Sequence, residues 1–590
     1  MGRPVLRKVN RAHWVRALLI VAGFFVHESG GFAQRPVIPG LPAPPLGSPL
    51  PGIAPEASPG VVPGLPRPAQ PTAPVGIASG ESYAIRSVTV EGASVFSQAV
   101  VGGLTAGLTG PAVRAGQIEA ARDALVTLYR SKGYVYTTAQ AVLRGPDLVF
   151  QVVEGYVAEV KLDGDIGPAG VQVLRFLNHL VGQRPLAAEQ MERWLLLAQD
   201  IPGLTVRSTL NPSTGDPGAL TLIAQVSRKL VSGYLSADNR AFNLAGPEEA
   251  LIAIGLNSLS EFGERTELSL FRTFNGSNIF GQLSEEFYIG GSGLKLKFYA
   301  GAGNSRPTGA LAAIGYDADT RVGGLQLTYP WLRTREQRLD VIGAFDIIES
   351  DIHTNTTGAV TRSSYDSVRV LRLGFDYALL DMLFGPGRNG VNDVRIRFGQ
   401  GLTILGASKA GDISNPPPRI GERTDFSKIH GELARTQTLF RPTEESSVAL
   451  HLAAKGQYAA NLLPPAEKFY LGGASFNRGF YYGQVTGDHG VAATAELRFN
   501  TPLPAPDFLP MKLSAQFYGF YDWGRVWQKT STEADVSLQS AGGGMRLYVG
   551  DRTEIDLEGV FRQSRFPSGQ GPGVSALNEA AFYWQVLFRY

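Results

Sequence analysis

The chain has 590 residues, no cysteine and a formal net charge of only +2 at neutral pH. The lack of cysteine excludes disulfides, iron–sulfur clusters, thiolate zinc sites and cysteine nucleophiles, and the near-neutral charge argues against nucleic acid as a partner. A composition of 44% hydrophobic and 10% aromatic residues with 71 glycines suits a β-rich chain with many turns.

The N-terminus predicts an export signal. Basic residues up to Arg16 precede an apolar run from Ala17 to Val26 and small residues around Ala33, which are the three parts of a secretory signal peptide. About ten apolar residues are too few for the roughly 20 that a spanning helix needs, so we favour a cleaved signal over 1–33 rather than a membrane anchor. If the exported chain is a membrane protein, it is then expected to be a barrel.

Residues 34–80 form a proline-rich stretch, as in Pro42-Ala43-Pro44-Pro45. Such a sequence forms neither a helix nor a paired strand, because proline lacks the backbone N–H that both structures use. We predict an extended, semi-rigid linker. A ligand for a proline-recognising domain is the alternative.

Residues 81–228 predict two α/β modules in tandem. The first, 81–155, has the pattern of a strand, helices and two more strands, and the second, 156–228, repeats that order at once, which indicates two copies of one small α+β domain. The first module is expected to have strands over 83–92, 136–143 and 147–153 and a helix over 117–132. The second is expected to have strands over 157–162, 205–210 and 219–226 and helices over 170–180 and 187–199.

Two short motifs in the first module carry a family resemblance. The segment from Tyr129 to Tyr134, which ends in Gly133-Tyr134, follows the helix, and Val153-Glu154-Gly155 ends the last strand. This pattern resembles the polypeptide-transport-associated (POTRA) domain, and two such domains before a β-region resemble the two-partner secretion transporters, the haemolysin secretion/activation proteins. The resemblance implies two periplasmic POTRA domains that capture a secreted exoprotein, a β-helical cargo of adhesin or haemolysin type.

Residues 229–590 predict an all-β transmembrane barrel. Helical periodicity ends near Leu230, and alternating runs such as 250–256, 266–271 and 367–377 continue to the C-terminus. Counting these runs gives about sixteen antiparallel strands, with about 22 residues for each strand and its connection. The further runs that we expect as strands are 294–299, 322–329, 338–347 and 393–401.

The last strand alternates cleanly. Phe588 and Tyr590 share one face with Phe582, and Arg589 shares the other with Tyr583. Outer-membrane barrels commonly end on such an aromatic strand, and this resemblance implies that Phe588 and Tyr590 form a signal for the barrel-assembly machinery. The final residue in that class is usually phenylalanine, so the tyrosine is a departure.

A long loop before the last five strands contains Asn477, Arg478, Gly479 and Phe480. An arm of about 12 residues, at up to roughly 3.3 Å each, reaches about 40 Å, enough to carry the tip well into a barrel. Arg-Gly-Phe at the tip of the sixth extracellular loop resembles the signature of the superfamily of outer-membrane insertases and translocators. The resemblance implies an inward-folded loop that gates the pore.

The expected partner of the loop is the strand motif Phe520, Asp522 and Gly524. The three side chains share one face by period 2, and an ionised aspartate is costly in lipid, so this face must line the lumen. We expect Arg478 and Asp522 to form a latch worth on the order of 1–3 kcal/mol after desolvation. A direct contact predicts that exchanging the two charges recovers some of the export that either single change loses.

The sequence favours a translocator over an enzyme. The seven histidines lack metal-ligand spacing, no Gly-x-Ser-x-Gly elbow is present, and Gly290 to Gly293 lacks the lysine of a phosphate loop, so we predict no catalytic residue, metal or cofactor. The expected partners are the exoprotein, outer-membrane lipid and the barrel-assembly machinery, with no nucleic acid.

Two alternatives share the barrel. An insertase that folds other barrels has the same loop and strand motifs but usually more POTRA repeats, and a passive porin has no need of Arg478. Members of the transporter family often begin with an amphipathic helix that plugs the pore, whereas residues 34–80 are too rich in proline to form one.

Overall fold

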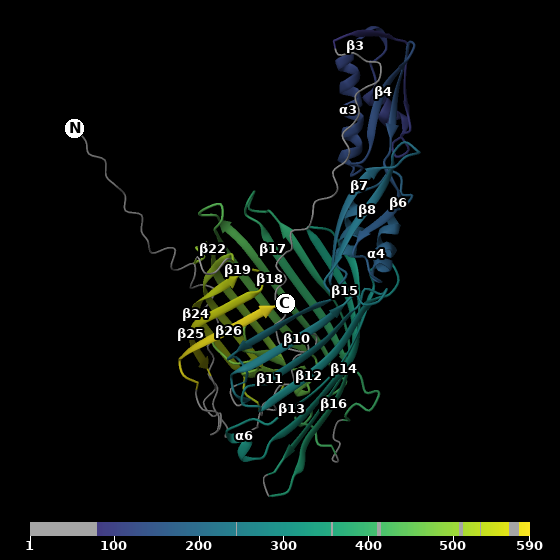
Figure 1. Cartoon of the computed structure of the whole chain (residues 1–590). Helices are drawn as coiled ribbons and strands as arrows, with labels where there is room; N and C mark the ends of the chain where they lie inside the picture. The colour runs from purple at the N-terminus through teal and green to yellow at the C-terminus, as the bar shows by residue number, and fades with distance from the viewer. Residues whose placement is uncertain are drawn as a thin grey trace, which may run out of the picture.

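The computed structural model describes residues 80–242, 245–355, 358–409, 415–506, 511–530, 533–565 and 577–590. The predicted signal peptide 1–33 and the proline-rich linker up to residue 79 lie outside these residues. Two α/β modules stand one above the other at one end of a large β-barrel (Figure 1).

The first module packs helices against a three-stranded sheet of order β2-β5-β4. Helix α3 turns one apolar face to that sheet, with Ile118, Leu125 and Tyr129 fully buried. Its elements are β1 (Ser82–Ile85), β2 (Ser87–Glu91), α2 (Gln98–Leu104), β3 (Gly110–Arg114), α3 (Ala115–Ser131), β4 (Thr138–Arg144) and β5 (Asp147–Val153).

The continuous strand predicted over 83–92 is wrong. The chain bends at Arg86, whose backbone N–H donates to Pro146 O at 2.8 Å and whose guanidinium binds Asp147. The bend divides the segment into β1, which pairs with β3, and β2, which pairs in parallel with β5. Local alternation cannot reveal this break, because the contacts that cause it come from the distant turn before β5.

A buried carboxylate, Glu154, joins the end of β5 to the core of the first module. It accepts hydrogen bonds from the Ser94 backbone N–H at 2.8 Å and from the Tyr129 hydroxyl at 2.7 Å. Burial alone would raise the pKa of Glu154, but the hydrogen bonds from Ser94 and Tyr129 outweigh it and hold the pKa below its ordinary value. The ionised carboxylate therefore stabilises the folded module.

This gives a pH prediction. A carboxyl whose pKa is lower in the folded state stabilises the fold above its unfolded pKa, and that stability is lost as the pH falls through the folded value. We expect the hydrogen-exchange protection factors of α3 and β5, corrected for the intrinsic exchange rate at each pH, to fall selectively in acid. Glu154→Gln should remove that pH dependence and about 1–3 kcal/mol of stability at neutral pH. An unchanged acid profile in the variant would show that another group is responsible.

The second module repeats the plan with a sheet of order β6-β8-β7. Its core is larger and holds Phe176, Leu177 and Met191 with no exposed surface. Its elements are β6 (Tyr156–Gly164), α4 (Gly170–Leu177), the 3-10 turn η1 (Asn178–Leu180), α5 (Ala188–Gln199), β7 (Leu204–Pro212) and β8 (Ala219–Arg228).

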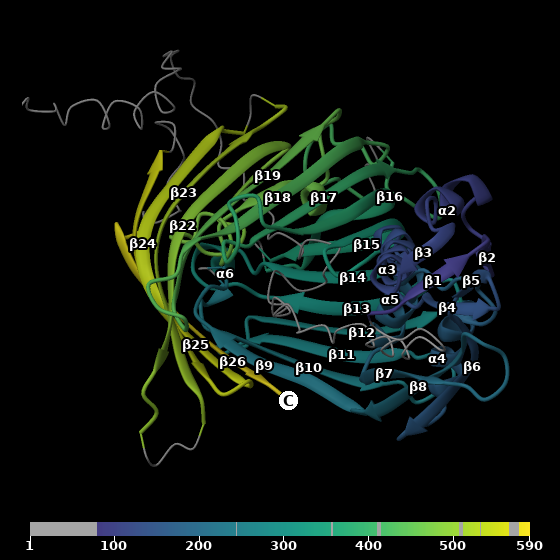
Figure 2. The same cartoon turned by 90° about the horizontal axis from the view of Figure 1, so that it is seen from above.

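The two modules and the barrel are joined by packing as well as by covalent connection. Tyr136, from the first module, packs into the core of the second. The second module in turn binds the near end of the barrel, where the Arg333 guanidinium donates to both oxygens of Asp200 at 2.8 Å and Arg193 donates to Pro330 O at 2.8 Å. The module is thus held over one sector of the barrel rim (Figure 2).

Within the described residues, sixteen antiparallel strands close the barrel, as the sequence predicted. The seam is formed by β26 and β9, and the Tyr590 N–H donates to Gly233 O at 2.9 Å there. The strands are β9 (Val231–Asp238), β10 (Glu249–Asn257), β11 (Arg265–Thr273), β12 (Asn278–Tyr288), β13 (Lys295–Ser305), β14 (Asp317–Arg333), β15 (Gln337–Thr354), β16 (Thr361–Asp381), β17 (Gly390–Gly401), β18 (Ser427–Phe440), β19 (Ser447–Ala459), β22 (His489–Leu503), β23 (Leu513–Trp527), β24 (Val536–Val549), β25 (Thr553–Arg565) and β26 (Ala580–Arg589). A short helix, α6 (Ala310–Ala313), lies between β13 and β14.

The barrel wall alternates between an apolar outer face and a polar inner face. On β12, Ile279 and Leu283 are exposed to the outside while Gln282 and Ser284 are buried. This pattern is typical of a strand with lipid on one side. Among the described residues, no helix is long and apolar enough to cross a membrane.

Candidate functional site in the barrel lumen

The connection between β19 and β22 folds inward as a structured hairpin. It contains the 3-10 turn η3 (Pro465–Glu467) and two short strands, β20 (Phe469–Leu471) and β21 (Val485–Gly487), which pair with each other. We call residues 460–488 the inner loop. Its apolar side chains pack on the wall strands in one cluster, which comprises Phe469, Leu471, Phe476, Phe480 and Val485 with Ala453, Ala492, Val526, Val536 and Leu538.

The tip of the inner loop places Arg478 against Asp522. The Arg478 backbone N–H and Nε donate to Asp522 Oδ2 at 2.8 and 3.1 Å, and Nη2 donates to Oδ1 at 3.0 Å. The two side chains are 4% and 0% exposed, so water screens the pair little. Asp522 lies five residues before the C-terminal end of β23, the end beside which the inner loop joins the wall, and so about 17 Å down the wall.

The other two residues of the strand motif also contact the loop. The Arg478 guanidinium lies 3.5 Å from the centroid of the Phe520 ring, which is a cation–π contact. A Cβ at Gly524 would lie 2.3 Å from Asn477 Oδ1, so only glycine leaves room for the docked tip. Each residue of the strand motif therefore has a distinct contact. The Phe520 ring packs against the Arg478 guanidinium, the Asp522 carboxylate accepts its hydrogen bonds, and Gly524 leaves space for Asn477.

The other residues of the tip, Asn477, Gly479 and Phe480, also contact the barrel wall or hold the turn of the backbone. Asn477 has a φ of 53°, a left-handed conformation that asparagine tolerates better than most residues, and its Nδ2 donates to Leu538 O at 3.0 Å. The Gly479 carbonyl accepts from Arg562 Nη1 at 2.8 Å and from the Tyr583 hydroxyl at 3.0 Å. Phe480 is 1% exposed. Contacts thus reach the tip from β23, β24, β25 and β26.

Several residues that contact the tip do not follow from the sequence. Arg478 also pairs with Glu496 and donates from Nη2 to Thr494 Oγ1 at 2.9 Å. Arg240, which follows β9, donates to the Arg478 carbonyl at 2.7 Å and to Glu558 at 2.7 Å. Strand register places Thr494 opposite Asp522 and Glu496 opposite Phe520. Predicting these contacts requires the pairing of β22 with β23, which the sequence pattern does not give.

These extra contacts change the expected result of exchanging the two charges. An aspartate at position 478 would face Glu496 as well as the new arginine, and two buried carboxylates at one site repel each other. We therefore expect Arg478→Asp with Asp522→Arg to recover no export, although the contact is direct. Secretion assays of the double and single variants check this, and substantial recovery would mean that Glu496 contributes little.

The C-terminal residues singled out by the sequence lie far from this site, at the seam. Phe588 and Tyr590 are 41% and 59% exposed on the outer face, and Lys229 Nζ lies 5.3 Å from the centroid of the Tyr590 ring. Their role in assembly stays a prediction. Their position fits it, because these side chains face outward on the strand that closes the barrel.

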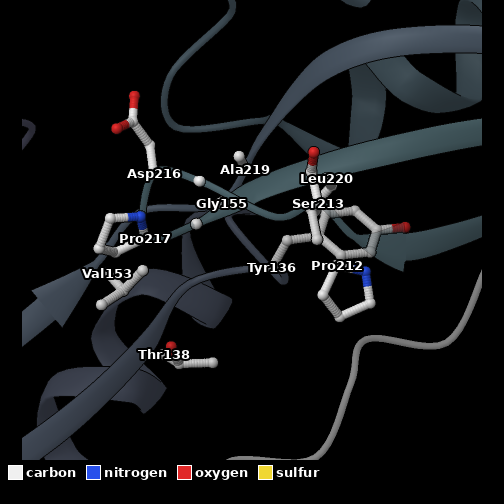
Figure 3. Close-up of a pocket in the computed structure, with 12 residues that line it drawn as sticks. Tyr136, Thr138, Val153, Gly155, Pro212, Ser213, Asp216, Pro217, Ala219 and Leu220 are labelled. Carbon is white, nitrogen blue, oxygen red and sulfur yellow. The ribbon is translucent and has the colours of Figure 1, made fainter.

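A cavity of about 320 Å³ lies between the two modules (Figure 3). Thr138, at the start of β4, and Pro212, at the end of β7, both line it. Each of these strands is at the edge of its own sheet. The cavity therefore connects two free strand edges.

Comparisons with known proteins agree with the fold. The family model described as haemolysin secretion/activation protein ShlB/FhaC/HecB matches residues 221–547, and the model for the ShlB-type POTRA domain matches residues 83–155. The chain is 22% identical over 441 residues to the heme/hemopexin transporter protein HuxB of Haemophilus influenzae strain 86-028NP, covering 71% of this chain and 72% of HuxB.

Two solved structures have the same fold. CdiB from Escherichia coli superposes with a TM-score of 0.65 at 17% identity and covers 89% of this chain and 94% of its own. CdiB from Acinetobacter baumannii gives a TM-score of 0.61 at the same identity and the same coverage.

The family model spans more than half of the 590 residues, and it separates this chain from the insertases. Proteins of this family are outer-membrane β-barrel transporters whose POTRA domains lie in the periplasm, which places the module end of the barrel on the periplasmic side. The chain belongs to the haemolysin secretion/activation family of two-partner secretion transporters.

Proposed function

We propose that this chain exports one large exoprotein through its barrel and that the inner loop controls the passage. The observation that carries the proposal is the Arg478 clamp: one buried arginine donates to Asp522, Glu496 and Thr494 and stacks on Phe520. A buried ion pair adds little net stability compared with apolar packing, but it fixes one geometry. Such a pair suits a loop that must return to the same position after each release.

Cargo capture is proposed to begin at the modules. Strand β7 is an edge strand of its sheet, lies on the lumen side of β8 and β6 in the view from above (Figure 2), and ends at the cavity where β4 begins. A free edge can bind an extended chain by strand addition, because its unpaired N–H and C=O groups supply the hydrogen bonds. We propose that cargo pairs along β7 and crosses the cavity toward β4.

A crosslinking experiment tests this capture. A photoreactive amino acid at Thr209, exposed on β7, is expected to crosslink secreting cargo, whereas the same group at Lys161, exposed on β6 at the other edge, serves as the matched control. Equal yields at the two positions would contradict docking along β7. A neighbouring reading frame that encodes a large repetitive exoprotein, β-helical in our proposal, would supply the cargo for this test.

The function itself is tested by restoring the gene to a deletion strain and recording purified protein in lipid bilayers. We expect secretion of the exoprotein and ion currents in the absence of cargo. A protein that supports neither would contradict export, and steady passage of small solutes with no dependence on Arg478 would instead indicate a passive porin.

A further inference from the structure

A second group of buried charges ties the inner loop to another part of the wall. Glu467, in η3, is 1% exposed and accepts from Arg372 Nη2 at 2.6 Å, while Lys428 Nζ lies 2.7 Å from its other oxygen. Lys428 also donates to the Glu467 carbonyl at 2.7 Å. The loop is therefore held here through both its side chain and its backbone.

Asp346 completes this group, because its carboxylate accepts from Arg372 Nε, whereas Glu467 accepts from the two terminal nitrogens of Arg372. Two carboxylates thus face two cations, and all four side chains are at most 12% exposed. A buried charge persists only when it is compensated. Glu467 therefore belongs to the loop by sequence but is part of a charge network on the wall. We define the base network as Asp346, Arg372, Lys428 and Glu467.

The base network and the Arg478 clamp lie on opposite sides of the strands from which the loop emerges. In barrel order, the base network comes from β15, β16 and β18, before β19, whereas the clamp comes from β22 and β23, after it. The inner loop therefore bridges two sectors of the lumen. Release of the tip alone leaves its base bound.

Further ion pairs hold the mouth of the loop. Asp488, at its C-terminal end, binds Arg419 at 2.8 and 3.0 Å, and Lys468 binds Glu533 at 2.6 Å. Arg419 belongs to the connection between β17 and β18 and Glu533 to the connection between β23 and β24, one on each side of the inner loop in barrel order, and the two pair with each other at 2.6 Å. The clamp at Arg478 is thus the innermost of several attachments.

We infer that Glu467 is a positioning residue that keeps the base of the inner loop on the β16–β18 wall while the tip is released, so that the loop pivots inside the barrel and does not leave it. This inference rests on the proposed control by the loop. Its physical basis is the larger number of attachments at the base. Opening the tip leaves one carboxylate, Asp522, without its cation, because Glu496 stays compensated by Arg498 and Arg546. Opening the base would leave Arg372 and Lys428 as buried cations opposite a single carboxylate, Asp346, and would also break the adjoining pair of Lys468 with Glu533.

The test compares full-length variants with the tip released, the base released or both. Arg478→Gln releases the tip, and Glu467→Gln with Lys428→Gln releases the base while leaving Asp346 and Arg372 as a balanced pair. Lys295→Gln with Glu286→Gln removes a wall ion pair of 2.9 Å that does not contact the loop, and so serves as the matched control.

The reporter is Ser475→Cys, an exposed position on the inner loop of a chain that has no other cysteine. A membrane-impermeant maleimide is added from outside, cargo-free currents are recorded, and heat-modifiable migration confirms that each barrel is folded. We call Arg478→Gln the tip variant and Arg478→Gln with Glu467→Gln and Lys428→Gln the combined variant. We expect the cysteine at position 475 to be labelled at least about fivefold faster in the combined variant than in the tip variant, because the two attachments are coupled. The control pair should leave labelling unchanged.

Equal labelling and currents for the tip variant and the combined variant would overturn the inference while leaving control by the loop intact. If both match the wild type, the proposed control fails instead. Glu467→Asp is a second test that keeps every charge but shortens the reach to Arg372 and Lys428. In the double variant Glu467→Asp with Arg478→Gln, the cysteine at position 475 should be labelled faster than in the tip variant. Equal labelling rates would also overturn the inference.

Discussion

Replacing Arg478 with glutamine is expected to lower secretion of the exoprotein at least about tenfold, because breaking a buried ion pair from one side costs about 3–5 kcal/mol. The change leaves Asp522 without its cation at a site that is 0% exposed. The tip of the inner loop then has no fixed resting position and competes with cargo for the lumen. Secretion assays and single-channel recordings measure both consequences, and cargo-free openings should become more frequent.

The matched control for this prediction is Arg498→Gln. Arg498 also binds Glu496, at 2.6 Å, but it belongs to β22, and within the described part of the chain it forms no hydrogen bond or ion pair with the inner loop. We expect it to keep most of the export. Arg478→Lys should fall between the two, because an ammonium keeps the charge but loses the two-pronged geometry and the flat contact with Phe520. Normal secretion and currents in Arg478→Gln would remove the clamp from the mechanism.

Gly524→Ala is expected to disrupt the same docking without changing any charge. The added methyl group would lie 2.3 Å from Asn477 Oδ1 and 2.8 Å from Leu471 Cδ2, too close for the tip to stay in place. Overpacking of this kind costs about 1–3 kcal/mol, which corresponds to a shift of about fivefold to more than a hundredfold away from the docked loop. Export and labelling of Ser475→Cys would report that shift.

Gly519 offers a control on the same strand. A Cβ there would meet only Gly542 O, at 3.8 Å, because Gly519 faces outward. Gly519→Ala should therefore export normally, and the contrast between the two alanines separates loop docking from strand propensity. Similar losses in both variants would mean that β23 itself, not the inner loop, is sensitive. Adding Asn477→Gly to Gly524→Ala should restore part of the export, since it removes the nearest clashing atom.

The sequence alone determined the architecture because local periodicity encodes it. Alternation with an apolar outer face fixes a membrane strand, and the repeat of strand, helices, strand, strand fixes the modules. Period 2 also placed Phe520, Asp522 and Gly524 on one face, and the structure finds all three buried there. The bend at Arg86 escaped this reasoning because its partners, Pro146 and Asp147, lie far along the chain.

Only the tertiary structure decided what surrounds Arg478. Closure of the barrel brings Arg240, after the first strand, and Arg562, near the last, to the same loop tip. Strand register sets Glu496 beside the clamp, and the inward fold of the loop sets Glu467 between Arg372 and Lys428. A charged residue on a lumen face looks the same in sequence whether or not it has such a partner. Its partner depends on pairing between distant strands, which local patterns do not encode.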